Sequence, residues 1–230
     1  MKRALLLCLA LPLLADIKQK VELGYFGTTG NTNTQSVTAA YRLTYKPDNT
    51  TKLHFWSDVL YATRHSKKSA ERYRASLELK HHYKRPIFSY LNIGFLRNVF
   101  QGYNQQYSVN PGFGYKLYRS KRQHVNLLLG YEFRRNNFTH EPSENLHYIK
   151  GEIEHLYKFT KKNRLKTTLD FIENIQKSDD YEIYLESYLL LHIVKRFNFK
   201  LTFECKYDNL PPKGKKSTDT ITKASIVYSF

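Results

Sequence analysis

The chain has 230 residues and a formal net charge of +17 at pH 7, with 19 Tyr and 14 Phe but one Trp. That length suits one large all-β domain or two small ones, and no linker or low-complexity run divides it. No stretch after residue 15 approaches the ~20 consecutive apolar residues of a membrane helix, so a helical membrane protein is excluded.

The first residues resemble an export signal. Met1–Arg3 is basic, Ala4–Ala15 is apolar apart from one proline, and Asp16 opens a polar stretch. We expect a cleavable signal peptide over 1–15 and a single domain over 16–230, the alternative being a buried N-terminal helix. Cys8 sits inside the apolar run after a leucine, so lipidation is not expected. Cleavage would leave Cys205 as the sole cysteine, which excludes an internal disulfide.

The rest of the chain shows repeated alternation of apolar and polar residues, the period of a strand with one apolar face. The clearest case is 197–208, where every odd position is apolar or aromatic. Twelve residues span about 40 Å, or about 28 Å when tilted, which matches a bilayer core. We expect strands at 36–45, 53–61, 73–83, 125–134, 149–159, 182–193, 197–208 and 219–230, and weaker ones at 18–29, 87–100, 105–118 and 164–176.

The connections between these strands alternate between two classes. One class is short and basic, at 46–49, 84–86, 119–122, 161–163 and 195–196. The other is mostly longer, at 30–33, 65–69, 101–105, 136–145, 177–180 and 209–217. Outer-membrane barrels have short periplasmic turns, longer outer loops and even strand numbers. We therefore predict an antiparallel up-and-down transmembrane β-barrel of about twelve strands, with both termini and the basic turns in the periplasm.

The last strand would close this barrel by pairing with the first, around Val21–Tyr25, which would leave no free sheet edge. Ala224, Ile226, Tyr228 and Phe230 share one face of it. We interpret Ile226, Tyr228 and Phe230 as an insertion signal read by the barrel-assembly machinery.

The segment Gly24–Thr34 looks like the opening signature of the salt-induced outer-membrane protein family, with spaced glycines followed by Gly30-Asn31-Thr32. The terminal Tyr228-Ser229-Phe230 is similar to the ending of outer-membrane barrels generally. The resemblance implies an outer-membrane β-barrel of uncharacterised function in a Gram-negative bacterium, and it transfers no catalytic residue.

The polar faces of the strands carry charges of both signs, and buried charges must be paired or wet. Two interpretations stay open: a narrow hydrophilic pore or small-solute site, and a cross-strand ion-pair network that fills the lumen. The predicted lumen-lining charged residues are Arg42, Asp58, Arg74, Glu78, Lys80, Lys116, Glu132, Arg134, Lys150, Glu152, Glu154, Lys158, Lys166, Asp170, Glu182, Glu186, Lys200, Glu204 and Lys206.

An outer-membrane hydrolase is the alternative from another class. His140 with Ser143, or with the pair Asp179-Asp180, would supply its groups, whereas His65-Ser66 point to opposite faces. Such acidic loop pairs are more often solvated turn residues, so no enzyme is expected. No cofactor or metal is expected either, because no His or carboxylate cluster has ligand spacing.

Basic residues gather in two predicted outer loops. One group comprises Arg64, Lys67, Lys68, Arg72 and Arg74, and the other Lys213, Lys215 and Lys216. They could bind phosphates of lipopolysaccharide, or form a solvated charged surface. Nucleic-acid binding is a poor alternative, because the charges are spread over all turns. The sequence leaves the oligomeric state unknown.

Aromatic residues form two predicted belts, one beside the short turns and one near the long-loop ends. Tyr45, Tyr83, Tyr118, Phe159 and Phe197 make the first, and Tyr61, Tyr73, Tyr107, Phe133, Tyr148 and Tyr207 the second.

The expected function is that of a non-enzymatic outer-membrane barrel, serving as a narrow pore, a binder of small polar solutes or a stress-related envelope component. The alternatives are the hydrolase and a soluble periplasmic barrel that binds lipid. Leu185→Arg or Leu201→Arg should cost ~2–4 kcal/mol, and Glu204→Gln should be tolerated far better.

Overall fold

The computed structural model describes residues 17–29, 34–64, 67–83 and 86–230, with side chains omitted for 25–29, 34–36, 64, 67 and 69. The predicted signal peptide, the Gly30–Asn33 connection and His65-Ser66 lie outside the described residues, as do Lys84 and Arg85. No helix in the described part of the chain is long and apolar enough to cross a membrane.

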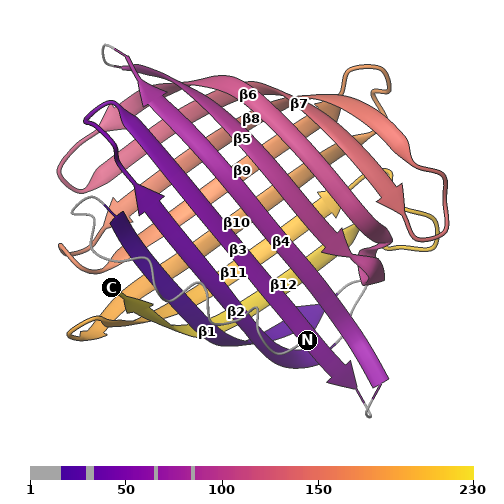
Figure 1. Cartoon of the computed structure of the whole chain (residues 1–230), viewed down its shortest axis with the longest axis horizontal. Coiled ribbons are helices and arrows are strands. Elements are labelled where there is room, and N and C mark those ends of the chain that lie inside the picture. The colour runs from indigo at the N-terminus through magenta and orange to yellow at the C-terminus, as the bar shows by residue number, and fades with distance from the viewer. Residues whose placement is uncertain (1–16, 30–33, 65–66, 84–85) are drawn as a thin grey trace.

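Twelve antiparallel strands form a single closed barrel, in which each strand pairs with its sequence neighbours (Figure 1). The strands are β1 (Ile17–Thr29), β2 (Thr34–Tyr45), β3 (Thr51–Arg64), β4 (Lys67–His82), β5 (Ile87–Asn98), β6 (Tyr103–Arg119), β7 (Gln123–Phe138), β8 (Glu144–Lys158), β9 (Arg164–Asn174), β10 (Tyr181–Val194), β11 (Phe197–Asp208) and β12 (Thr218–Ser229). A short 3-10 turn, η2 (Val99–Gln101), joins β5 to β6. The predicted fold class and strand number are confirmed.

The barrel closes where β12 meets β1, as the sequence predicted. Val21 is the register partner of Tyr228, and Tyr25 is the partner of Ala224. The backbone N–H of Phe230 donates to the carbonyl oxygen of Gln19 at 3.0 Å, which extends the pairing to the last residue. The pairing of β1 with β12 therefore leaves no free sheet edge between these two strands.

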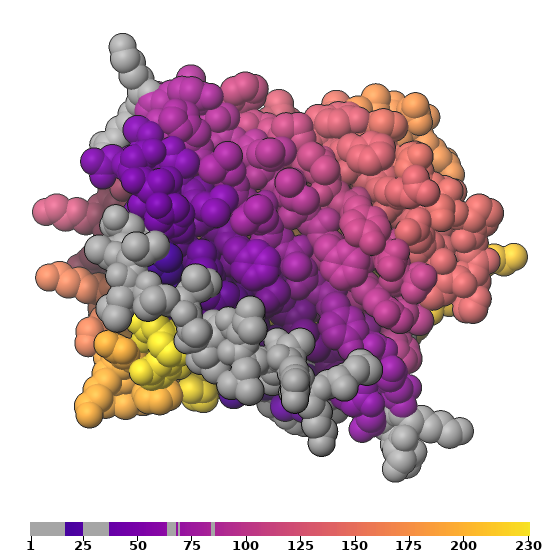
Figure 2. Space-filling view, in the orientation of Figure 1, coloured from indigo at the N-terminus to yellow at the C-terminus, as the bar shows by residue number. Residues whose placement is uncertain are grey.

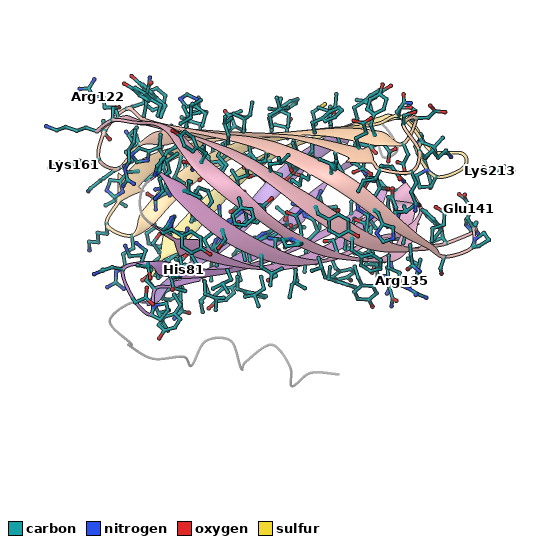
Figure 3. All side chains as sticks on the ribbon, turned by 90° about the horizontal axis from the view of Figure 1, so that it is seen from above. His81, Arg122, Arg135, Glu141, Lys161 and Lys213 are labelled. Carbon is teal, nitrogen blue, oxygen red and sulfur yellow. The ribbon has the colours of Figure 1, made fainter. Side chains whose placement is uncertain are left out.

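The connections lie at two ends, which we call the turn end and the loop end. The turn end holds the connections at 46–50, 83–86, 120–122, 159–163 and 195–196, together with the start of β1 and the end of β12. Figure 3 shows Arg122 and Lys161 at this end and Glu141 and Lys213 at the other. Their periplasmic and outer placement remains a prediction.

The length difference between the two classes is smaller than predicted. The connection expected at 65–69 is nearly absent, because β3 runs to Arg64 and β4 begins at Lys67. Likewise, β6 begins at Tyr103 inside the expected 101–105 loop. These predicted loop positions belong to strands, and a register shift between Ala62 and Thr63 interrupts the β3–β4 pairing beside the first of them. The longest connection is 209–217.

Alternation sets the two faces of the wall. Large apolar side chains such as Leu23, Phe113 and Leu129 point outward and are exposed, while the intervening polar side chains point into the barrel. Side chains project all around the outside of the barrel (Figure 3), and the outer wall visible in Figure 2 is continuous. The exposed apolar set has the character of a lipid-facing belt.

Aromatic rings from β5 fill one side of the interior, over glycines of the next strands. Phe88 is the register partner of Gly114, and Tyr90 is the partner of Gly112. A Cβ atom on Gly114 would lie 2.0 Å from the Phe88 ring, so the ring occupies the space that a side chain would need. Such ring-over-glycine packing stabilises curved sheets.

Tyr148 was predicted to lie in the aromatic belt near the loop ends, and this prediction is wrong. Its side chain is buried inside the barrel, where its hydroxyl donates to Asp180 at 3.0 Å. Tyr148 has the same even parity as Lys150 and Glu152 on β8, so the alternation places it inside with them.

Candidate functional site

A cluster of five charges crosses the middle of the lumen. Arg72 on β4 donates to Asp58 on β3 at 3.2 Å and to Glu204 on β11 at 3.1 Å. Arg74 contacts the same two carboxylates at 2.6 and 3.3 Å, and Lys223 on β12 also pairs with Glu204. Since β4 and β11 are not neighbours in the barrel, the contacts of Arg72 and Arg74 with Glu204 join opposite walls. We call this the central cluster.

A second cluster lies nearer the loop end. Arg134 on β7 contacts Glu132 at 2.7 Å and Glu182 on β10 at 2.9 Å, and Lys206 bridges Glu182 and Asp208 at 3.1 and 3.3 Å. The ring of Tyr148 lies 4.6 Å beneath the Arg134 guanidinium. A cation held by carboxylates and by a ring face is well compensated for burial.

Two further groups lie toward the turn end. Glu22 on β1 pairs with Arg42 on β2 at 2.5 Å and with Lys200 on β11 at 3.2 Å. On the other side, Glu154 on β8 pairs with Lys166 on β9 at 2.8 Å and with Lys80 on β4 at 3.7 Å. Because β4 and β8 are not adjacent, the Lys80 contact also crosses the lumen.

Water reaches these groups to different extents. The side chains of Arg72 and Glu204 in the central cluster keep 7% and 3% of their exposure. Toward the turn end Arg42 keeps 30% and Lys166 keeps 33%, and beyond the central cluster Lys206 keeps 24%. Dry groups also occur on both sides, because Lys200 and Arg134 each keep 5%. What distinguishes the two sides is that the most exposed cations of these clusters, Arg42, Lys166 and Lys206, lie outside the central cluster.

The family model for a "protein of unknown function, DUF481" matches residues 21–230. The chain belongs to the DUF481 family. That description says nothing of salt, so the salt-induced name implied by the resemblance remains a prediction. No curated protein sequence matches the chain significantly.

Solved outer-membrane barrels share the fold of this DUF481 chain. The NanC porin superposes with a TM-score of 0.61 at 6% identity, covering 90% of this chain and 98% of the porin. The translocator domain of the autotransporter NalP from Neisseria meningitidis gives 0.58 at 9% identity, covering 94% and 88%. The COG4313 outer membrane channel from Pseudomonas putida F1 gives 0.56 at 10% identity, covering 95% and 97%. At these identities the likeness concerns the fold.

Most members of these clusters are among the predicted lumen residues. The contacts of the other predicted residues are as follows. Lys150 bridges Glu152 at 3.1 Å and Asp170 at 2.9 Å, and Lys80 also pairs with Glu78 at 3.2 Å. Three predicted residues remain. Lys116 lies 6.0 Å from the Phe88 ring, and Glu186 accepts a hydrogen bond from the Tyr184 hydroxyl at 3.4 Å. Lys158 lies at the turn end of β8.

Four members were missed by the prediction: Glu22, Arg72, Asp208 and Lys223. Arg72 was assigned to an outer basic loop, and this is wrong because β4 extends to Lys67 and carries Arg72 inside, two positions from Arg74. Glu204 was expected to tolerate Gln. Its contacts with three cations reverse that expectation.

The predicted outer-loop basic residues mostly contact the barrel itself. Lys68 pairs with Glu71 at 2.7 Å, and the Lys215 ammonium donates to the carbonyl oxygen of Phe100 at 2.6 Å. The backbone N–H of Lys213 donates to Glu141, and Lys216 is exposed. The side chains of Arg64 and Lys67 lie outside the described residues. Lipopolysaccharide contact remains a prediction.

The candidate hydrolase groups have other surroundings. Asp180 is buried and accepts from Tyr148 and from the Asn174 amide at 2.7 Å, while His140 and Ser143 are exposed in the 139–143 connection. Within the described residues, no group of three or more His, Cys, Asp or Glu side chains could hold a metal ion.

Proposed function

We propose that this chain is an outer-membrane barrel that admits small polar solutes to a narrow, charged lumen constricted at the central cluster. The observation that carries the proposal is the water-accessible charge on both sides of that cluster, at Arg42 and Lys166 and at Lys206. Charged groups enclosed by a barrel stay ionised without large cost where water reaches them.

The outer wall supports a place in the membrane. Leu23, Phe113, Leu129 and Leu201 expose large apolar surfaces around the cylinder, and in water such a surface would promote aggregation. Outer-membrane barrels carry an apolar outer band and a polar interior. The sequence-predicted signal peptide is consistent with this proposed location.

The two alternatives fit less well. A soluble lipid-binding barrel needs an apolar interior, whereas Asp58, Arg134, Lys150 and Glu182 point into this one. A hydrolase needs a nucleophile held by a base, whereas Asp180 is held by Tyr148 and Asn174.

Conductance in planar bilayers tests the proposal. The refolded wild type should carry a small current. The double variant Arg72→Gln/Glu204→Gln should carry a severalfold larger one, because the ion pair that joins opposite walls is gone. Replacing both partners removes one charge of each sign, so the net charge of the central cluster stays the same, although Lys223 loses its carboxylate partner.

A matched control is Lys68→Gln/Glu71→Gln, which neutralises an ion pair near the loop end of β4 that does not cross the lumen. Its conductance should equal that of the wild type. If the wild type and the double variant both fold correctly and neither carries a current, the protein is not a pore.

A further inference from the structure

Several cations inside the turn end have no acidic partner among the residues that the structure describes. Lys20 on β1, Lys52 on β3, Lys158 on β8 and Arg164 on β9 occupy inward positions near the turns. In the part of the chain that the structure describes, no carboxylate oxygen lies within 4.0 Å of these four groups; their neighbour Glu22 is already held by two cations. The Nε atom of Arg164 is buried and donates to nothing in the protein.

The strand register places like charges directly opposite one another here. Lys20 faces Arg42, Lys52 faces Lys80, and Lys158 faces Arg164. Directly opposed like charges destabilise a sheet. Elsewhere in the lumen a counter-ion relieves such a pair, as Lys150 does for Glu152 and Asp170.

The cations of opposite walls also act on one another. Arg164 and Lys200 both repel the Lys20 ammonium. Lys80 and Lys166 repel Lys52, and the more distant carboxylates of Glu78 and Glu154 offset part of this repulsion. β3 and β9 lie on opposite sides of the barrel, so the repulsion between Lys52 and Lys166 acts across the lumen and not along the wall. Cations from several strands therefore exceed the carboxylates inside the turn end, and an excess of one charge sign within low-dielectric walls concentrates counter-ions.

The geometry points to an anion-binding vestibule inside the turn end, formed by Lys20, Lys52, Lys158 and Arg164, that takes small multiply charged anions of the phosphate or polycarboxylate type. One such anion could accept hydrogen bonds from cations of several strands, including one from the Arg164 Nε–H, which has no acceptor in the protein. This inference deepens the proposed function and rests on it for the class of solute admitted.

The exposed turns reinforce the same field. Two of the turns at this end carry the exposed cations Lys121, Arg122, Lys161 and Lys162, and Figure 3 shows Arg122 and Lys161 projecting from the barrel. Toward the turn end, the acidic side chains Glu22, Glu78 and Glu154 each pair with a cation. Further acidic groups, such as Glu182, Asp208 and Asp219, lie toward the loop end. The charge distribution along the barrel axis is therefore uneven, and anions are drawn to the turn end.

The single tryptophan of the chain offers a direct probe. Trp56 points inward on β3, on the same face as Lys52, and its register partner on β2 is Arg42. In detergent at low ionic strength, iodide should quench its fluorescence at least about twofold more than caesium does, with acrylamide as the neutral reference. Inorganic phosphate should protect Trp56 from iodide more than chloride of equal ionic strength.

The variant Lys52→Gln/Arg164→Gln should lower the iodide-to-caesium ratio toward one, although Arg42 and Arg74 still lie beside Trp56. Lys213→Gln/Lys216→Gln removes the same charge at the other end and should leave the ratio unchanged. Equal quenching by both ions, no response to acrylamide, or phosphate acting only as chloride does would each overturn the vestibule. Heat-modifiable gel migration would establish that each variant is folded.

These readouts separate the inference from the proposed function. A barrel that passes no current can still fill its vestibule with iodide, and a conducting barrel can show no preference for iodide.

Discussion

The guanidinium of Arg72 on β4 lies 3.1 Å from a carboxylate oxygen of Glu204 on β11, although the two residues are separated by 132 positions in the sequence. This ion pair joins opposite walls of the barrel, and both of its side chains are buried. Glu204 also holds Arg74 and Lys223, so one carboxylate compensates three cations.

Replacing Glu204 with Gln should therefore destabilise the barrel by about 3–5 kcal/mol, because buried cations lose their counter-charge. Urea titration of the refolded protein in lipid vesicles, followed by heat-modifiable migration, measures the change. The exposed Glu141→Gln is the control and should stay within about 0.5 kcal/mol of the wild type. Equal midpoints for the two variants would contradict the role of Glu204.

Leu201→Arg tests which face meets lipid. Leu201 points outward from β11 and is 41% exposed, and an Arg there should cost ~2–4 kcal/mol if it lies near the bilayer midplane. Leu210, 47% exposed in the 209–217 connection, provides a matched control in which Leu→Arg should be nearly neutral. Stability in vesicles is the measurement, and similar costs at both positions would refute a lipid-facing β11.

Gly24→Ala tests the closing seam. A Cβ atom at Gly24 would lie 2.2 Å from the Ser225 hydroxyl oxygen and 2.9 Å from the carbonyl oxygen of Ala224, so β1 and β12 would have to separate. We expect a loss of about 1–3 kcal/mol from this overpacking. At Gly151 a Cβ atom would meet nothing within 4 Å, so Gly151→Ala should not destabilise the barrel. Thermal unfolding of the two variants compares them directly.

The sequence predicts the wall of this barrel better than its interior. Alternation in 197–208 identifies the faces of β11 because side-chain period depends only on the local backbone. The same parity would have placed Tyr148 and Arg72 inside, had the strands been extended far enough. The Arg72–Glu204 contact is different in kind, since it depends on closure and on the approach of walls that are distant in sequence.

We expect the stability of the turn that contains Asp48, which lies outside the spanning strands, to depend on pH. Hydrogen bonds from the hydroxyl and backbone N–H of Thr50 and from the Thr51 N–H lower its pKa to about 2. A depressed pKa in the folded state stabilises the turn above the unfolded value of 3.8. This stabilisation should disappear as the pH falls from about 4 through about 2.

Carboxyl NMR titration measures the Asp48 midpoint directly. Thr50→Ala removes the hydroxyl donor and should raise the midpoint toward 3.8, the value expected in a short peptide of the same sequence. A folded-state midpoint that matches the peptide would contradict the hydrogen-bonded turn.

Phe230→Ala tests the predicted insertion signal. The Phe230 ring is exposed on the outer face and lies 4.8 Å from the Tyr228 ring, so it contributes little to the packing of the interior. If the assembly machinery reads this residue, Phe230→Ala should lower the folded fraction in cells severalfold. Once refolded in vitro, its stability should stay within about 1 kcal/mol of wild type, since the backbone N–H still donates to Gln19. Phe203→Ala removes an equally outward ring from the middle of β11 and should leave cellular assembly near normal. If both variants lost cellular assembly equally, Phe230 would matter as one more apolar side chain and not as a terminal signal.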